Sequence, residues 1–211
     1  MSCADSFSPD LAFEKAARES GHASIAGIDE AGRGPWAGPV VAASVVLTEG
    51  AIPAGLNDSK KLREDKRERL FDELIGCSQV GIGIAEVERI DRDNILAATM
   101  WAMAESVKAL PHTPDYALID GNRLPDLHCD AEAVVKGDGR SLSIAAASII
   151  AKVTRDRILR DLDGQYPGYG FARHKGYGTR QHQQALAKLG LCPAHRKSFA
   201  PIRLLLENRA A

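Results

Sequence analysis

The 211-residue chain has few cysteines, few aromatic residues and no long apolar run. Its four cysteines, Cys3, Cys77, Cys129 and Cys192, show no CxxC spacing, which argues against a zinc site or a disulfide framework. An aromatic content of 5% is too low for a platform that stacks single-stranded bases. Because no apolar run reaches roughly 18 to 20 residues and no basic segment leads into an apolar one at the N-terminus, we expect a soluble, cytoplasmic protein without a membrane partner.

The size of the chain and its apolar content set the number of domains. With 45% hydrophobic and 26% charged residues, the chain can fill one core well and is short for two. We therefore expect a short helix or arm over residues 1–22. A single domain over residues 23–211 follows, and it ends in a helical segment over about residues 179–211.

The net charge of −1 hides an uneven distribution along the chain. Residues 1–135 carry 13 Lys and Arg against 23 Asp and Glu, a net charge of −10, whereas residues 136–211 carry 14 against 5, a net charge of +9. The C-terminal third is therefore either a surface that binds a polyanion or a solvated face that pairs with the acidic part. Composition leaves both interpretations open.

The order of the predicted elements indicates an α/β protein. Residues rich in β-branched types predict strands over 25–31, 40–47, 80–85, 116–119 and 131–136, the first two forming an antiparallel pair. Helices are expected over 60–74, 90–110, 144–162, 181–189 and 202–208, with a loop over 164–178. Asp58 or Ser59 is expected to cap the first of these helices, and Ser141 or Ser143 the third. Such an order favours a sheet that mixes antiparallel and parallel neighbours.

Two adjacent carboxylates, Asp29 and Glu30, end an apolar stretch and are followed at once by Gly32, Arg33 and Gly34. Carboxylate oxygens suit hard cations such as Mg²⁺ or Mn²⁺, and glycines let backbone N–H groups come close to a ligand. Neighbouring side chains on a strand point to opposite faces, so the two carboxylates can share one cluster only if the chain turns there, as the glycines would allow. The alternative is an ordinary exit from a strand into a loop.

Two further aspartates, Asp120 and Asp138, follow two other predicted strands. In α/β sheets ligands bind beyond the carboxyl ends of the strands, so these side chains are expected near Asp29. Several carboxylates at one place repel one another unless cations neutralise them, which favours a metal cluster. Each Asp-Gly pair taken alone is also a common turn former.

Five stretches of the chain, in order, closely resemble bacterial ribonuclease HII, the type 2 ribonuclease H family. They are GIDEAGRGPWAGPVVAA, LNDSKKL, IDGN, VKGDGRSLSIAAASIIAKVTRDR and HKGYGT, and the likeness covers roughly residues 25–205. The resemblance implies a ribonuclease H-like mixed five-stranded sheet flanked by helices, with a small C-terminal helical extension. It also implies an endonuclease that hydrolyses the RNA strand of RNA/DNA hybrids, cuts 5′ of single ribonucleotides in duplex DNA, and serves DNA replication and repair.

The resemblance also implies roles for individual residues. By motif position the metal ligands are Asp29, Glu30, Asp120 and Asp138, which would bind Mn²⁺ or Mg²⁺ in a two-metal mechanism that leaves 3′-hydroxyl and 5′-phosphate ends. The ribose would be read by Gly32, Arg33 and Gly34, the sugar at the RNA–DNA junction would pack on Tyr177, and Lys60 would contact a phosphate. A monomer is expected, and whether a sliding clamp is a partner stays open.

The remaining basic residues and the histidines are interpreted from their positions in the chain. Lys152, Arg155, Arg157 and Arg160 lie on one predicted helix, where some are expected to approach the duplex backbone and others to be solvated. His174 and His182 are interpreted as phosphate or structural contacts without a catalytic role. Two rival functions remain: a two-metal nuclease of the same fold that acts on DNA alone, and a non-catalytic module that binds hybrids, whose mark would be a missing carboxylate.

Overall fold

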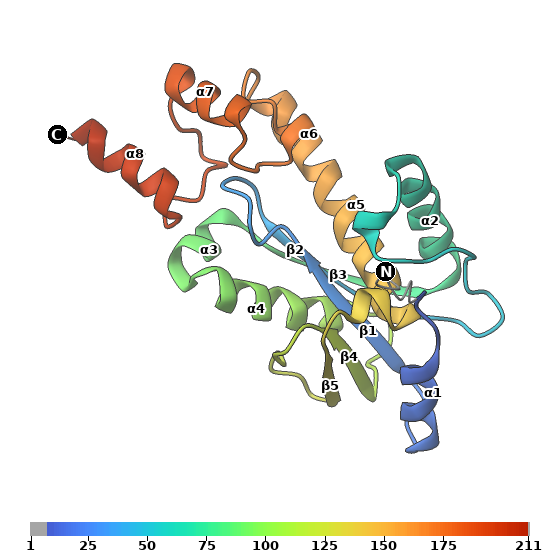
Figure 1. Cartoon of the computed structure of the whole chain (residues 1–211). Helices are drawn as coiled ribbons and strands as arrows, with labels where there is room; N and C mark the ends of the chain where they lie inside the picture. The colour runs from blue at the N-terminus through green and yellow to red at the C-terminus, as the bar shows by residue number, and fades with distance from the viewer. Residues whose placement is uncertain (1–7, 211) are drawn as a thin grey trace, which may run out of the picture.

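The computed structural model describes residues 8–210, which form a five-stranded sheet with helices on both faces (Figure 1). The strands are β1 (Ile25–Ala31), β2 (Val40–Val46), β3 (Gln79–Ala85), β4 (Tyr116–Asp120) and β5 (Asp130–Val134), in the spatial order β3-β2-β1-β4-β5. The β1–β2 and β2–β3 pairs are antiparallel, whereas β1–β4 and β4–β5 are parallel. The expected α/β fold with a mixed five-stranded sheet is confirmed.

Alternate residues of β2 face two separate cores. Ala43 and Val45 pack with α2 (Glu64–Cys77) and α5 (Leu142–Gln165). Val40 and Ala42 pack instead with α4 (Ile95–Lys108). The sheet therefore lies between two helical layers, and its central strands are apolar on both sides.

The helix α5 lies directly on β1 because small residues fill the contact. A Cβ atom on Gly27 would come within 2.1 Å of the carbonyl carbon of Ser143, so no larger residue fits there. Ser141 caps the helix, accepting a hydrogen bond from the backbone N–H of Ile144 at 3.2 Å. This contact fixes the start of α5 close to the strand that carries Asp29.

Two predicted helices are divided in the structure, and a polar side chain caps one part of each. The helix expected over 90–110 is divided into α3 (Val87–Asp93) and α4 at Asn94, which has φ 70° and accepts from the N–H groups of Leu96 and Ala97. The helix expected from residue 60 is a 3-10 turn, η1 (Ser59–Lys61), followed by α2. Asp58 caps that turn, accepting from the N–H of Lys60 at 2.9 Å. Asn and Asp are favoured at such positions because their side-chain oxygens accept from the free N–H groups at the start of a helix or turn.

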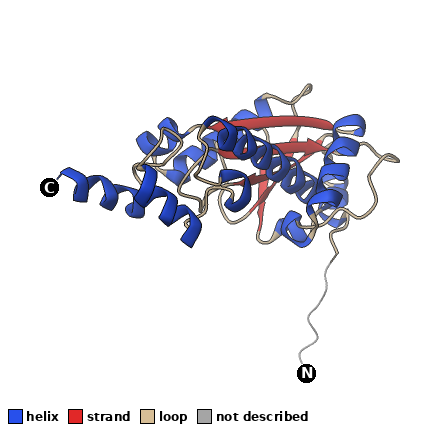
Figure 2. Ribbon diagram, turned by 90° about the horizontal axis from the view of Figure 1, so that it is seen from above, coloured by secondary structure: helices blue, strands red, loops and turns tan. Residues whose placement is uncertain are grey.

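The first and last helices lie at opposite ends of the described part of the molecule (Figure 1). The helix α1 (Ala12–Glu19) lies at one end, and α6 (Phe171–His174), α7 (Arg180–Leu189) and α8 (Ala200–Ala210) gather at the other, where α8 projects (Figures 1 and 2). The predicted loop over 164–178 thus contains one short helix, α6. A third core, which includes Ala37, Leu159, Phe171 and Ile202, joins this C-terminal group to the loop between β1 and β2.

Two expectations about composition can be compared with the described residues. Cys77, Cys129 and Cys192 are free thiols, whereas Cys3 lies outside the described part. No helix within residues 8–210 is both long enough and apolar enough to cross a membrane.

Candidate active site

Three of the four predicted carboxylates come together. Asp29 lies on β1, Asp120 ends β4, and Asp138 lies in the 3-10 turn η2 (Gly137–Gly139) that follows β5. One carboxylate oxygen from each lies within 4.8 Å of the others. The parallel pairing of β1 with β4 brings the first two together, and Asp120 Oδ1 accepts from the N–H of Gly137 at 2.7 Å, which ties η2 to the end of β4.

The cluster holds more negative charge than its surroundings favour. Burial, and then the carboxylates of Glu30, Asp120 and Asp138, raise the pKa of Asp29 well above its ordinary value. Burial and the neighbouring carboxylates of Asp120 and Asp58 likewise raise the pKa of Asp138, although Lys60 opposes this. Buried like charges at this separation are stabilised by a bound cation, and three carboxylate oxygens suit a hard one. The residues present therefore fit a divalent metal.

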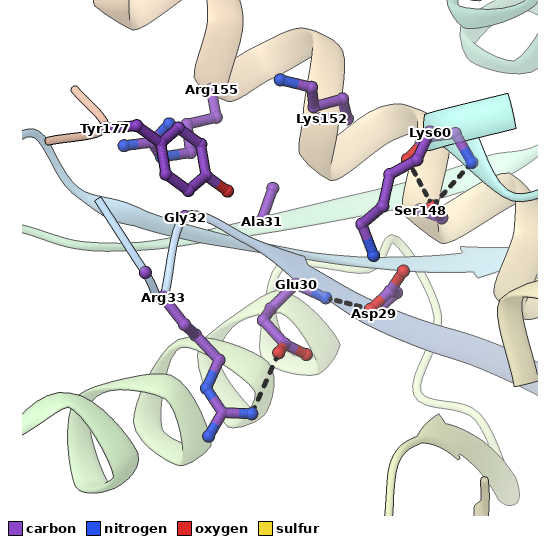
Figure 3. Close-up of a pocket in the computed structure, with 12 residues that line it drawn as sticks. Asp29, Glu30, Ala31, Gly32, Arg33, Lys60, Ser148, Lys152, Arg155 and Tyr177 are labelled. Atoms are coloured by element: carbon purple, nitrogen blue, oxygen red, sulfur yellow. Dashed lines mark hydrogen bonds and ion pairs between the residues drawn. The ribbon is translucent and has the colours of Figure 1, made fainter. Parts of the chain in front are cut away.

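Glu30 lines the same cleft as Asp29, although the chain does not turn between the two residues. The β1–β2 ladder continues through the pair Ala31–Val41, so the strand stays regular past Glu30. The Glu30 carboxylate faces Arg33, whose Nη1 donates to Oε1 at 3.3 Å (Figure 3). Burial raises the pKa of Glu30 against the effect of Arg33, and Asp120 adds to the rise. Glu30 is thus electrostatically linked to the cluster but lies outside the group of three.

The Gly-Arg-Gly turn and Tyr177 line one cleft with Asp29. The cleft has a volume of about 340 Å³, and its lining includes Gly32, Arg33, Gly34 and Tyr177 (Figure 3). Gly32 has φ +100°, a conformation that favours glycine. The Tyr177 side chain is 51% exposed, and a Cβ atom on Gly34 would lie 3.4 Å from its ring. The structure thus places side by side the residues that the sequence assigned to sugar recognition.

Lys60 lies over the same cleft and points toward Asp29 (Figure 3). The turn that carries it is held by Ser59 and Ser148: Ser148 Oγ donates to Ser59 Oγ at 2.7 Å and accepts from the N–H of Ser59 at 3.3 Å. Burial lowers the pKa of Lys60, but the carboxylates of Asp58, Asp138, Asp29 and Asp120 outweigh it, so the pKa is raised. Lys60 is therefore a cation at neutral pH beside the carboxylates.

Two buried arginines that the sequence did not single out for this role hold the turn from behind. Arg196 donates to carbonyl oxygens of the loop over residues 32–39, and Arg155 donates to the carbonyls of Pro39, Ala37 and Lys175. Burial lowers the pKa of Arg196 to about 9 and that of Arg155 to about 10, so both remain charged at pH 7. Arg196 is one of many basic residues in the C-terminal third, and a single residue forms no sequence pattern. Its role in holding the loop could therefore not be predicted from the sequence.

Two histidine side chains, His182 and His195, form a hydrogen-bonded series that supports the backbone of Tyr177. The carbonyl of Tyr177 can only accept, so His182 Nδ1, 3.0 Å away, carries the proton in the neutral ring. His182 Nε2 then accepts from His195 Nε2 at 3.0 Å, and His195 Nδ1 accepts from the N–H of Cys192 at 3.0 Å. Burial lowers the pKa of His182 to about 4 and also lowers the pKa of His195. His174, also buried, contacts the carbonyl of Tyr169, which fits a structural role.

The four basic residues of α5 do not form one surface for phosphates. Arg155 is buried against backbone carbonyls, so a role for it as a duplex contact is wrong. Arg157 and Arg160 pair with Glu68 of α2 at 2.6 and 2.9 Å. Lys152 pairs with Asp156 at 2.6 Å. Its side chain is partly exposed to solvent and lines the cleft. Much of the basic charge on this helix therefore serves the protein itself.

The fold and the carboxylate cluster define a class of protein. A mixed sheet in the order 3-2-1-4-5 with three clustered carboxylates on neighbouring elements is the architecture of a ribonuclease H-like, metal-dependent nuclease. Residues 26–202 match the family model described as Ribonuclease HII. The chain belongs to the ribonuclease HII family, metal-dependent endonucleases that cleave RNA in RNA/DNA hybrids.

Individual relatives agree with this assignment. A "Ribonuclease HII" of Azorhizobium caulinodans is 57% identical over 190 residues, which cover 90% of this chain and 73% of that protein. The crystal structure of ribonuclease H2 from Pyrococcus horikoshii superposes with a TM-score of 0.74 at 28% identity, covering 88% of this chain and 98% of the other. The ribonuclease HII in a PCNA complex from Archaeoglobus fulgidus has a TM-score of 0.67 at 27% identity, covering 82% and 94%.

Proposed function

We propose that the chain, besides cleaving RNA in hybrids, cuts 5′ of single ribonucleotides embedded in duplex DNA and leaves 3′-hydroxyl and 5′-phosphate ends. One observation carries this proposal: a cluster of three carboxylates adjoins a cleft lined by a Gly-Arg-Gly turn and an exposed tyrosine. The cluster supplies a place for phosphodiester chemistry. The turn and the tyrosine supply a surface that fits a sugar.

We assign Asp29, Glu30, Asp120 and Asp138 as the catalytic metal ligands for Mg²⁺ or Mn²⁺. When bound, two such cations would activate a water on one side of the phosphate and stabilise the leaving oxygen on the other. The chain's own part is to hold the carboxylate oxygens. Asp29 Oδ1 accepts from the N–H of Glu30 at 2.7 Å, and Asp120 Oδ1 accepts from the N–H of Gly137, so two of the ligands are oriented by backbone groups.

Recognition of the substrate is assigned to the other side of the cleft. The backbone of Gly32, Arg33 and Gly34 would bond the 2′-hydroxyl, Tyr177 would pack on the adjoining sugar, and Lys60 would contact a phosphate. A site built to hydrogen-bond a hydroxyl rejects an analogue that lacks it by up to about 10⁴ to 10⁵-fold, because its polar groups are left unpaired. This surface therefore suits an enzyme that finds one ribose among deoxyriboses.

The cellular role follows from that substrate. We propose that the enzyme acts as a monomer in the cytoplasm and removes ribonucleotides during DNA replication and repair. The relative from Archaeoglobus fulgidus forms a complex with PCNA. A sliding clamp is by that analogy a partner to test for this chain.

Cleavage of three matched duplexes in Mg²⁺ tests the proposal: an RNA/DNA hybrid, DNA with one ribonucleotide, and all-DNA. The first two should be cut and the third left intact. Cutting of all-DNA at a similar rate would favour a nuclease that acts on DNA alone, and binding without cutting would favour a non-catalytic hybrid-binding module.

Tyr177→Ala sharpens the assay. The loss should be larger on the single ribonucleotide than on the continuous hybrid, because a junction has one ribose to recognise whereas a hybrid offers many registers. Equal losses on the two substrates, measured at the same metal and salt concentrations, would remove the junction-reading role from Tyr177.

A further inference from the structure

The carbonyl groups of the loop over residues 32–39 converge on one guanidinium group. Arg196, which is fully buried, donates five hydrogen bonds, and each goes to a carbonyl oxygen of this loop. The acceptors are Gly32 at 2.6 Å, Arg33 at 3.0 Å, Pro35 at 2.7 Å, Gly38 at 2.8 Å and Pro39 at 3.1 Å. All five donors of the side chain are used, so its orientation is fixed.

Two of these carbonyls determine where two N–H groups point. In a trans peptide the C=O and the N–H point in opposite directions, and the described chain has no cis peptide bond. The carbonyls of Gly32 and Arg33 face Arg196, so the N–H groups of Arg33 and Gly34, which share their peptide planes, face away from it. Within the described residues neither N–H donates to a backbone carbonyl outside the strands. Both residues line the cleft beside Tyr177 (Figure 3).

We infer that Arg196 is a positioning residue for ribose recognition. By holding the carbonyls of Gly32 and Arg33, it directs the N–H groups of Arg33 and Gly34 into the cleft, where they donate to the 2′-hydroxyl oxygen of the substrate. Arg196 itself touches no substrate. The inference rests on the proposed role of the Gly-Arg-Gly turn.

Lysine at this position would be a poor replacement. Its ammonium group has three donors and no planar fork, so at least two of the five carbonyls would lose their partner. Carbonyls that converge without enough donors repel one another, and the loop would relax. A shift of about 1 Å in groups that contact the substrate can cost about 100-fold in rate.

A matched control separates this effect from general loosening. Leu159 is fully buried in the core that lies behind the same loop, and a Cβ atom on Gly38 would lie 3.1 Å from it. Leu159→Ala leaves a cavity there and should lower the melting temperature, yet it removes no hydrogen bond from the carbonyls of Gly32 and Arg33.

The test compares binding of a duplex that has one ribonucleotide with binding of the all-DNA duplex. Fluorescence anisotropy in Ca²⁺, chosen to slow cleavage, gives both Kd values, and thermal unfolding reports the fold. We expect Arg196→Lys to lose about tenfold or more of the preference for the ribonucleotide while Leu159→Ala keeps it within about threefold. A folded Arg196→Lys with wild-type preference would overturn the inference, as would an equal loss in Leu159→Ala.

The unaltered chain offers a second measurement, which also serves if Arg196→Lys does not fold. Nitrogen-15 NMR follows the amides of Arg33 and Gly34 and the guanidinium of Arg196 as each duplex is added. We expect all three to shift with the ribonucleotide and not with all-DNA. If the amides do not respond, the proposed role of the turn fails. If the amides respond and the Arg196 signals do not, the inference fails and the role of the turn stands.

Discussion

The carboxylate cluster adjoins, through Asp29, the surface that we propose reads the sugar, and the two are built in different ways. This sugar-reading surface consists of Gly32, Arg33, Gly34 and Tyr177. Asp29 and Asp120 lie on adjacent strands whose positions are set by a regular ladder of backbone hydrogen bonds. The sugar-reading surface lies on irregular loops, which are held by side chains distant in sequence: Arg196 bonds to Gly32, and His182 bonds to the Tyr177 carbonyl. A ladder of backbone hydrogen bonds positions a residue whatever its side chain is. A loop held by side-chain hydrogen bonds depends on the identity of each of those side chains.

Because of this difference, mutations on the two sides of the cleft should differ in how they affect the reaction rate and the stability of the fold. Replacing a carboxylate on the ladder should change the reaction and leave the fold intact. Replacing a side chain that holds the loop by hydrogen bonds, such as Arg196, should affect recognition and stability together. Each prediction below tests one side of this contrast.

The largest effect is expected at the carboxylates. Asp138→Asn and Asp29→Asn should each lower the cleavage rate in Mg²⁺ by more than about 100-fold, because an amide is a neutral and weaker ligand and outer-shell partners alone are worth about 10- to 100-fold. Asp29→Asn should also raise the stability of the metal-free protein, since it removes a buried, repelled charge.

Single-turnover rates and thermal unfolding check this prediction, with Asp126→Asn, an exposed aspartate between β4 and β5, as the control. A variant that folds and cleaves at a rate near that of the wild type would remove its residue from the metal site.

The next effect contrasts two glycines of the same turn. Gly32 has φ +100°, and a Cβ atom there would lie 2.0 Å from Arg155 Nε and 2.8 Å from the Pro39 carbonyl oxygen. Gly32→Ala should therefore cost about 2 to 4 kcal/mol. At Gly34 the first contact is the Tyr177 ring at 3.4 Å, so Gly34→Ala should keep its stability within about 1 kcal/mol and lose activity on ribonucleotides.

Urea unfolding and cleavage of the single-ribonucleotide duplex measure the two effects. Equal loss of stability in both variants would contradict the assigned geometry of the turn.

The same contrast explains what the sequence could reveal. Strand patterns predicted the sheet and placed Asp29, Asp120 and Asp138 near strand ends, because ligands of α/β sheets lie beyond the carboxyl ends of the strands. The predicted cluster also included Glu30, which lies outside the group of three. The division at Asn94 was missed because one side chain outweighs a helical pattern of 21 residues in the range 90–110. The role of Arg196 could not be predicted because it depends on a contact between residues 164 positions apart, Gly32 and Arg196, which no local pattern encodes.

A pH-dependent effect is expected from the hydrogen-bonded histidines. The pKa of His182 is about 4 in the folded protein against an ordinary value of 6.5, so the unfolded chain binds the proton first. The resulting stability is fully present above pH 6.5 and is lost as pH falls toward 4, by up to about 1.4 kcal/mol per pH unit. A proton on His182 would also set its Nε2–H against that of His195 and disturb the Tyr177 backbone.

Chemical unfolding between pH 4 and 7 measures the slope in the wild type and in His182→Gln, in which this group no longer titrates. A slope that is unchanged in the variant would show that His182 is protonated equally in both states. Nitrogen-15 NMR of the His182 ring tests the expected tautomer, in which Nδ1 carries the proton.

The smallest effect concerns a segment outside the residues that match the family model. Glu14 of α1 is buried, and its Oε1 accepts from Ser141 Oγ at 2.6 Å and from the Ser143 N–H and Oγ at 2.9 and 2.6 Å. It thus places a negative charge at the start of α5, directly after the turn that carries Asp138. Asp10 adds two backbone hydrogen bonds, to Arg140 and from Leu142.

If the N-terminal helix helps to hold the carboxylate side of the cleft, Glu14→Gln should cost about 1 to 2 kcal/mol. The amide keeps one acceptor but loses the charge, and it places donors where the buried Oε2 has no partner. The Mg²⁺ concentration that gives half-maximal cleavage should rise by a few fold, because η2 is held less firmly and Asp138 with it. Glu19→Gln, at an exposed position of the same helix, is the matched control. If the two variants behave alike in thermal unfolding and in Mg²⁺ dependence, the carboxylate cluster depends on the strand ladder and on the hydrogen bond from Gly137 to Asp120, without help from α1. The contrast between the two sides of the cleft then becomes sharper.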